Sequence, residues 1–148
     1  MRERFSIFVF AITRIYKYIK SLESEMAARI GVKGVHVFWI YTLFCEKGGL
    51  TASEIAQKNH VNRSLVSREI VRLEKEEIIA YQTEGDCNNK YNAKIVLTEK
   101  GREIARSIFK AGVETQQSVG EDVPVEELKI FYSVLDRLAD KLSRTSLK

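Results

Sequence analysis

A short polar stretch between residues 62 and 72 combines small hydroxyl side chains with arginines. Placed on a helix at about 100° per residue, Ser64, Ser67 and Arg68 fall opposite an apolar stripe. Small side chains permit close approach, and a guanidinium can donate two hydrogen bonds to the O6 and N7 atoms of guanine. The stretch therefore predicts contact with base edges in a DNA groove. The candidates at the start of this helix, where such contacts concentrate, are Asn62, Arg63, Ser64, Leu65, Ser67 and Arg68, and Arg72 further along is expected to meet phosphates, bases or acidic neighbours.

Catalytic and metal-binding patterns do not appear elsewhere in the sequence. The sequence has no glycine-rich phosphate loop, no Cys-x-x-Cys and no His-Glu-x-x-His. His36 and His60 stand far apart, and adjacent carboxylates such as those of Glu76 and Glu77 are typical of a solvated helix end. We therefore expect a protein that is not an enzyme and that has no metal site and no cofactor.

The residues before the polar stretch predict a second helix that would position it. Thr51 followed by Glu54 is the pattern of a capping box at a helix start. Ile55 and Ala56 would then face inward, and the small Ala56 would let the next helix cross closely. Residues 58–62 form the turn, with Val61 as its buried residue and Asn62 as a good N-cap for the following helix. The helix that carries the polar stretch would dock on this preceding helix and on the domain core through an apolar stripe, which consists of Val66, Ile70 and Leu73.

Residues 79–97 read as a β-hairpin. Apolar residues alternate with polar ones on both sides of a turn-forming segment, residues 85–89. Lys90 lies at the expected tip, where a wing would touch the minor groove or the DNA backbone. A hairpin with a merely solvated lysine is the alternative. Helix, turn, helix and hairpin together predict a winged helix-turn-helix.

These residues resemble the MarR family of bacterial transcriptional regulators. The blocks that carry the resemblance, in the family's order and spacing, are 50–56 (LTASEIA), 61–68 (VNRSLVSR), 73–74 (LE) and 97–101 (LTEKG). The resemblance covers nearly the whole chain and implies a homodimeric, sequence-specific regulator of transcription. It further implies a repressor that binds an inverted repeat in double-stranded DNA.

The sequence departs from the family at three places. Asn89 and Lys90 stand where the family's wing has an aspartate followed by arginines, so the bracing ion pair and the planar donor are both missing. His60 and Glu77 occupy positions where the family often has glycine. A left-handed backbone at His60 would be less favourable than with glycine.

The flanking segments predict further helices. Residues 4–29 carry an apolar stripe and are interpreted as a core-facing helix, and residues 35–45 form a strongly apolar helix. A helix over 98–118 and a final one starting near Pro124 follow. The predicted fold is mainly α with a small β-hairpin, in one domain over 1–148. About 1–30 and 99–148 would form a dimerisation layer and about 35–98 the winged helix, because the outer helices carry more apolar surface than a small domain can cover.

Composition is consistent with this interpretation. The chain has 148 residues, 45% of them hydrophobic, and a net charge of +4, which permits nucleic-acid binding without proving it. Two cysteines do not make a disulfide framework and suit a reducing cytoplasm. Cys45 is expected to be a packed thiol, and Cys87 an exposed one open to modification. The apolar run near the N-terminus is too short to span a membrane.

The sequence leaves two further alternatives open. Members of the family often bind small aromatic molecules near the dimer helices, and Tyr16, His36, Trp39 and Tyr41 are the candidate liners. The same four residues are also ordinary core aromatics. The rival to DNA binding is a winged-helix module that binds proteins, which would expose larger apolar residues than the serines and arginines found here.

Overall fold

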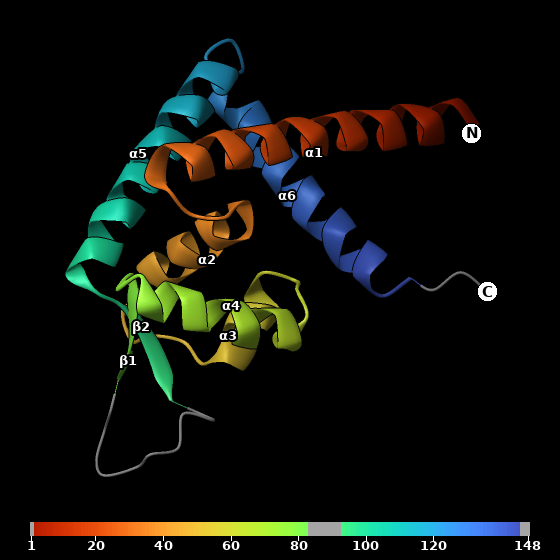
Figure 1. Cartoon of the computed structure of the whole chain (residues 1–148). Coiled ribbons are helices and arrows are strands. Elements are labelled where there is room, and N and C mark those ends of the chain that lie inside the picture. The colour runs from red at the N-terminus through yellow and green to blue at the C-terminus, as the bar shows by residue number, and fades with distance from the viewer. Residues whose placement is uncertain (1, 83–92, 146–148) are drawn as a thin grey trace. The chain divides into compact units, whose positions relative to one another are not determined.

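The computed structural model describes residues 2–82 and 93–145 (Figure 1). Within these residues the elements are α1 (Arg2–Ile30), α2 (Gly34–Cys45), α3 (Ala52–Lys58), α4 (Arg63–Lys75), β1 (Ile79–Gln82), β2 (Lys94–Leu97), α5 (Glu99–Gly120) and α6 (Val125–Ser143). The mainly helical fold with a small sheet confirms the predicted fold class. The chain divides into two compact units, Met1–Phe109 and Lys110–Lys148, which are described separately.

Local capping determines where α3 and α4 begin. The Thr51 side chain accepts a hydrogen bond from the Glu54 backbone N–H at 3.2 Å, and the Glu54 carboxylate accepts one from the Thr51 N–H at 2.7 Å. This is the predicted capping box. Asn62 caps α4 by accepting from the Ser64 N–H at 3.2 Å. Both helix starts are therefore fixed by residues adjacent to them in sequence.

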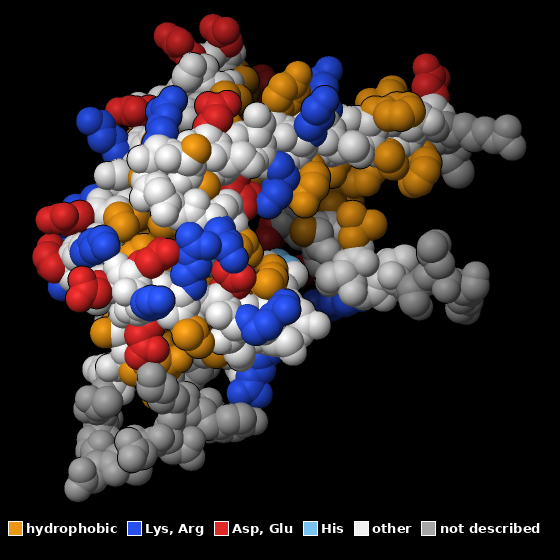
Figure 2. All heavy atoms as spheres, viewed as in Figure 1, with side chains coloured by type: hydrophobic (Ala, Val, Ile, Leu, Met, Phe, Trp, Pro, Cys, Tyr) orange, Lys and Arg blue, Asp and Glu red, His pale blue; other side chains and the backbone are white. Residues whose placement is uncertain are grey.

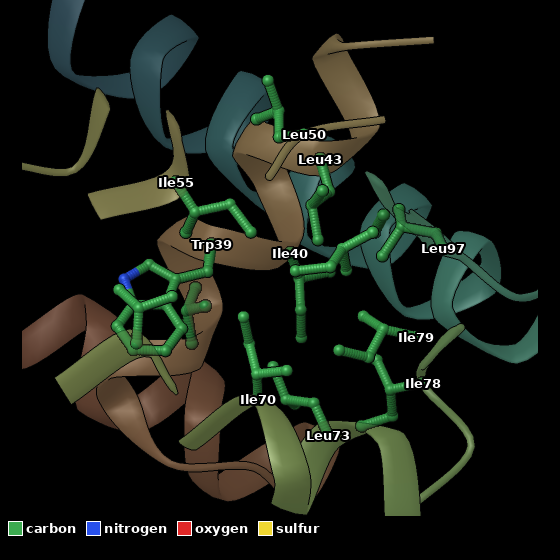
Figure 3. Packing of buried hydrophobic residues seen from close by; sticks show 14 of the residues in the cluster. Trp39, Ile40, Leu43, Leu50, Ile55, Ile70, Leu73, Ile78, Ile79 and Leu97 are labelled. Atoms are coloured by element: carbon green, nitrogen blue, oxygen red, sulfur yellow. The ribbon is translucent and has the colours of Figure 1, made fainter. Parts of the chain in front are cut away.

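One hydrophobic core joins α2, α3, α4 and the sheet (Figure 3). The predicted inward residues Ile55, Ala56, Val66, Ile70 and Leu73 are all buried. Val61, the expected centre of the turn, is partly buried against the same core. The remaining large, fully buried members include Trp39, Ile40, Ile79 and Ile95. Because α4 inserts only its apolar stripe, its other side is left free to face away from the domain.

The two strands form the antiparallel pair that the sequence predicted. Ile79 pairs with Leu97 and Gln82 with Lys94, and a bridge between Leu50 and Ile95 ties the strand to the segment before α3. The predicted tip of the wing, with Cys87 and Lys90, lies outside the described residues. The sheet therefore anchors the base of the predicted wing.

Gly101 makes the junction between the sheet and α5 unusually close. An added Cβ at Gly101 would lie 2.0 Å from the carbonyl oxygen of Ile78. The Thr98 hydroxyl caps α5 by accepting from the Gly101 N–H at 3.0 Å. The close approach at this glycine is a backbone-to-backbone contact, which no other residue type allows.

The first helix differs from its prediction. α1 begins before residue 4, and only Glu23 and Ala27 of its described side chains are buried. Figure 2 shows hydrophobic side chains gathered along α1. The large apolar residues left exposed on α1 are Phe5, Ile7, Val9, Phe10, Ile12, Ile15, Tyr16, Tyr18, Ile19 and Leu22. The interpretation of the whole helix as core-facing is wrong for the single chain, because only its C-terminal turns reach the core.

The second unit contains the end of α5 and all of α6. Pro124 is the N-cap of α6 rather than its first helical residue. No residue of α6 is buried in the single chain, and Val125, Ile130, Phe131, Tyr132, Val134 and Leu142 are exposed. No helix in the described part of the chain has the length and apolar character that a bilayer crossing requires.

Candidate nucleic-acid interface

The outward face of α4 is a polar surface on a firmly seated helix. Ser64, Ser67 and Arg68 are exposed, whereas Val66 and Ile70 are fully buried on the opposite side. Asn62 at the N-cap fixes where the helix starts. A helix held on one side and lined with small polar side chains and an arginine on the other has the form that groove reading requires.

The structure gives two of the predicted contact residues other roles as well. The Asn62 side-chain oxygen is engaged in capping, although the residue remains exposed. Leu65 is only partly accessible and packs against the core, so it contributes to seating α4. Arg63 is exposed at the first position of the helix.

Val71 is an outward-facing residue that the candidate set omitted. Its side chain is 61% exposed, one to two turns after Ser64 and Ser67 on the same face. An exposed apolar group on a groove-reading helix suits the C5-methyl group of thymine. Helical spacing already placed Val71 on the outward face with Ser64 and Ser67, but it was not counted among the predicted contact residues.

Arg72 is engaged within its own helix. Its Nε donates to the Glu76 carboxylate at 2.7 Å, and this hydrogen bond raises the pKa of Arg72. The pair is half-exposed, so water screens it and it is a weak contact that another anion can displace. The expectation that Arg72 meets an acidic neighbour therefore holds in the free chain.

Glu69 of α4 forms an interaction that the sequence did not reveal. Lys33 donates to both Glu69 carboxylate oxygens at 2.8 Å, and His36 Nε2 lies 3.0 Å from Glu69 Oε2. Hydrogen bonds from Lys33 and then His36 lower the pKa of Glu69. His36 is completely buried, and burial lowers its pKa despite the opposing effect of Glu69. Three charged or titratable groups from two distant segments therefore meet at the flank of α4.

The four candidate ligand residues fall into two groups. His36 and Trp39 are buried in the core, with ring centroids 5.7 Å apart, whereas Tyr16 and Tyr41 are exposed. Tyr41 stacks on Phe109 at 6.5 Å. A ligand site at these residues stays a prediction, as does the contact that Lys90 would make.

Cys45 is exposed in the single chain, which corrects the expectation of a packed thiol. It ends α2 on the same helix face as Phe38 and Tyr41, which are also exposed. A hydrogen bond to Cys45 raises the pKa of Tyr41. Among the described residues, no three side chains of His, Cys, Asp or Glu gather in a way that could hold a metal ion.

Comparison with known proteins finds a relative in sequence and solved structures of similar fold. No family model matches the chain. It is 30% identical over 112 residues to the HTH-type transcriptional regulator MntR of Geobacillus kaustophilus, covering 68% of this chain and 73% of that protein. Its fold is similar to that of Staphylococcus aureus MepR in a DNA complex, with a TM-score of 0.77, 18% identity and coverage of 91% and 96% of the two chains.

A second solved structure has the same fold. Staphylococcus aureus MarR in complex with salicylate and kanamycin superposes with a TM-score of 0.81 at 15% identity, over 95% of this chain and 93% of that one. The shared fold agrees with the motifs in residues 50–101. The chain therefore belongs to the HTH-type transcriptional regulators, and its winged-helix fold is that of the MarR family.

Proposed function

We propose that this chain is a homodimeric repressor that binds an inverted repeat in double-stranded DNA. In this proposal α4 enters the major groove, and Ser64, Ser67 and Arg68 contact base edges. Arg63 and Arg72 contact phosphates or bases, and Lys90 contacts the backbone or minor groove beside them. The observation that carries the proposal is the outward face of α4, which exposes serines and an arginine while the opposite stripe is buried.

The chemistry of this face favours DNA over a protein partner. Ser64 and Ser67 are too small to fill a pocket, and a protein-binding helix generally anchors itself through large apolar side chains. Val71 is the one large hydrophobic residue of α4 that is strongly exposed. The DNA complex of Staphylococcus aureus MepR shows that a protein of this fold can use it on DNA.

Homodimerisation is supported by the apolar surfaces of α1 and α6. Ten large apolar residues of α1 and six of α6 are exposed in the single chain, each set spread along its helix. A soluble monomer rarely leaves contiguous apolar surface of this extent open to water. A second copy would cover such surfaces in a two-fold arrangement and place two α4 helices about one DNA turn, roughly 34 Å, apart.

Release by a small aromatic molecule completes the proposal. The salicylate complex of Staphylococcus aureus MarR supports this part. Tyr16, His36, Trp39 and Tyr41 are the proposed liners. A ligand can shift DNA affinity only by binding more tightly to the DNA-incompetent geometry.

The test begins with selection of duplexes from a randomised pool, followed by fluorescence-anisotropy titration at several salt concentrations. Arg68→Ala is expected to cost about 1–3 kcal/mol on the selected site. Arg106→Ala, which removes the same charge from α5, is the matched control and should have a smaller effect. Absence of any selected duplex, with no binding at low salt, would refute DNA binding and favour the protein-interaction module.

Each remaining part of the proposal has its own measurement. Sedimentation at micromolar concentration should give twice the chain mass of 17.0 kDa, and only the single mass would refute the dimer. A reporter downstream of the selected site should be silenced, since a repressor blocks transcription, and activation would refute repression. Salicylate should raise the melting temperature and weaken DNA binding, and no change in either would count against the effector.

A further inference from the structure

The contact between the start of α2 and the middle of α4 joins three residues far apart in sequence. Lys33, the N-cap residue of α2, and His36, in the first turn, both reach Glu69. The sequence separations are 36 and 33 residues. We call Lys33, His36 and Glu69 the α2–α4 clamp. It joins the start of α2 to a side chain of α4 that is next to Arg68 in sequence.

The position of Glu69 on α4 gives this contact a particular effect. At about 100° per residue, Glu69 lies at the border between the buried stripe and the outward face. The stripe residues seat α4 by hydrophobic burial, which has little directional preference. Hydrogen bonds depend strongly on distance and angle. The clamp can therefore fix the rotation of α4 about its own axis, and that rotation determines where Ser67 and Arg68 point.

We propose that Glu69 is a positioning residue for sequence reading, held by Lys33 and His36 so that the outward face of α4 has one orientation. This inference rests on the proposed DNA binding. Glu69 itself carries a negative charge close to the proposed phosphate contacts, which opposes DNA binding. Its position is therefore not explained by attraction to DNA, and the two contacts from α2 supply another reason for a carboxylate there.

His36 adds a dependence on pH to the clamp. Its Nε2 faces the Glu69 carboxylate, and its buried Nδ1 has no hydrogen-bond partner among the described residues. A neutral ring donating from Nε2 satisfies Glu69, whereas a protonated ring would place a second N–H in a buried position without an acceptor. The charged groups that face His36 are Glu69 and Arg72 of α4 and Lys33 before α2. Burial outweighs the attraction of Glu69 and lowers the pKa of His36, so the folded chain disfavours the protonated ring.

The decisive experiment compares two variants that remove the same charge from α4. Glu69→Gln weakens the clamp by removing the charge and one of the two acceptor oxygens, whereas Glu76→Gln removes a carboxylate that is paired with Arg72 within the helix. Both should bind random DNA somewhat more tightly, because repulsion of the phosphates falls. We expect the ratio of selected-site to random-DNA affinity to fall at least about fivefold in Glu69→Gln, since hydrogen bonds to charged groups are the strong class. The ratio should stay within about twofold of wild type in Glu76→Gln.

Variants of α2 separate positioning from simple loss of structure. Lys33→Met should lower the selectivity ratio, whereas Lys33→Arg, which keeps the charge, should retain it. Because Lys33 is half-exposed, both variants should fold. His36→Gln retains a donor for Glu69 without a group that titrates near neutral pH. We therefore expect His36→Gln to keep selectivity at pH 7.5 and to lose the fall in selectivity that wild type shows as the pH drops below the ordinary histidine pKa of about 6.5.

The outcomes are distinct. Glu69→Gln could raise the affinity for the selected site and for random DNA by the same factor, as Glu76→Gln should. That result would overturn the positioning role. Unchanged selectivity in Lys33→Met would overturn it even if Glu69→Gln failed to fold. Loss of all DNA binding in wild type would instead refute the proposed function on which the inference depends. An identical pH profile in wild type and His36→Gln would remove the role of His36.

Discussion

Glu77 holds a left-handed backbone just after α4, and replacing it with glycine should stabilise the protein. Its φ is 59°. Glu77 N–H donates to the Glu74 carbonyl and Ile78 N–H to the Leu73 carbonyl, both at 2.9 Å. This pair of bonds is the Schellman motif, in which glycine is the usual left-handed residue. The chain places a glutamate where the motif favours glycine.

The size of the effect follows from two opposing contributions. The left-handed conformation costs a residue with a Cβ about 1–2 kcal/mol. Glycine also makes the unfolded chain more flexible, which lowers the free energy of unfolding by about 0.4–1 kcal/mol. The net stabilisation for Glu77→Gly is therefore about 0.5–1 kcal/mol, or a rise in melting temperature of a few degrees.

The assay is urea denaturation followed by circular dichroism, at one protein concentration so that dimerisation does not change the comparison. Lys75→Gly is the matched control, because Lys75 lies in the right-handed last turn of α4 and should lose about 0.5–1 kcal/mol. Glu77→Asn should fall between wild type and glycine. Destabilisation of Glu77→Gly equal to that of Lys75→Gly would refute the assignment of strain to this position.

Four further predictions concern stability. Thr51→Ala should lower the unfolding free energy by about 1 kcal/mol through loss of the capping box, whereas an unchanged urea midpoint would contradict that role. Gly101→Ala should cost at least 1–3 kcal/mol, roughly the cost of overpacking, because the added Cβ meets the Ile78 carbonyl oxygen; a soluble variant melting with wild type would contradict the close contact. Ile70→Ala should cost about 2–5 kcal/mol by urea denaturation, since Ile70 is only 2% exposed, and a loss under 1 kcal/mol would contradict that burial. Stability should fall as the pH drops from about 6.5 toward the lowered pKa of His36, since the unfolded chain there binds the proton more readily than the folded one, and His36→Gln should flatten that part of the profile.

The helix-turn-helix was predictable because its determinants are local. Thr51 and Glu54 are three residues apart, and Asn62 caps α4 by accepting from the N–H of Ser64, two residues further along. Helical periodicity alone separated the buried Val66 and Ile70 from the exposed Ser67. The left-handed backbone at His60, with φ of 52°, was considered because the resembled family has glycine there, and Glu77, with φ of 59°, also stands where that family often has glycine.

The same local reasoning failed where a side chain's role depends on a distant segment. Glu69 was given no role from the sequence, because nothing near it in sequence points to Lys33 and His36. Leu65 was placed with the contact residues because of its position near the helix start, but it packs against the core. Cys45 was assigned to the interior because its neighbours are apolar. In each case the direction of the side chain is fixed by tertiary packing, which periodicity does not encode.

The outer helices show a different limit, which concerns the reference state for burial. The stripe on α1 was interpreted as core-facing, although its residues Ile15 and Leu22 are 45% and 46% exposed, and on α6 Leu142 is 57% exposed. The spacing of apolar residues predicts that one face of a helix is buried. It does not say whether the surface that covers this face belongs to the same chain or to a second copy. Burying apolar area contributes roughly 25 cal/mol per Å² in either case. The stripe on α1 is therefore better read as a surface for a second copy, and the proposed dimer accounts for it without any change to the core that seats α4.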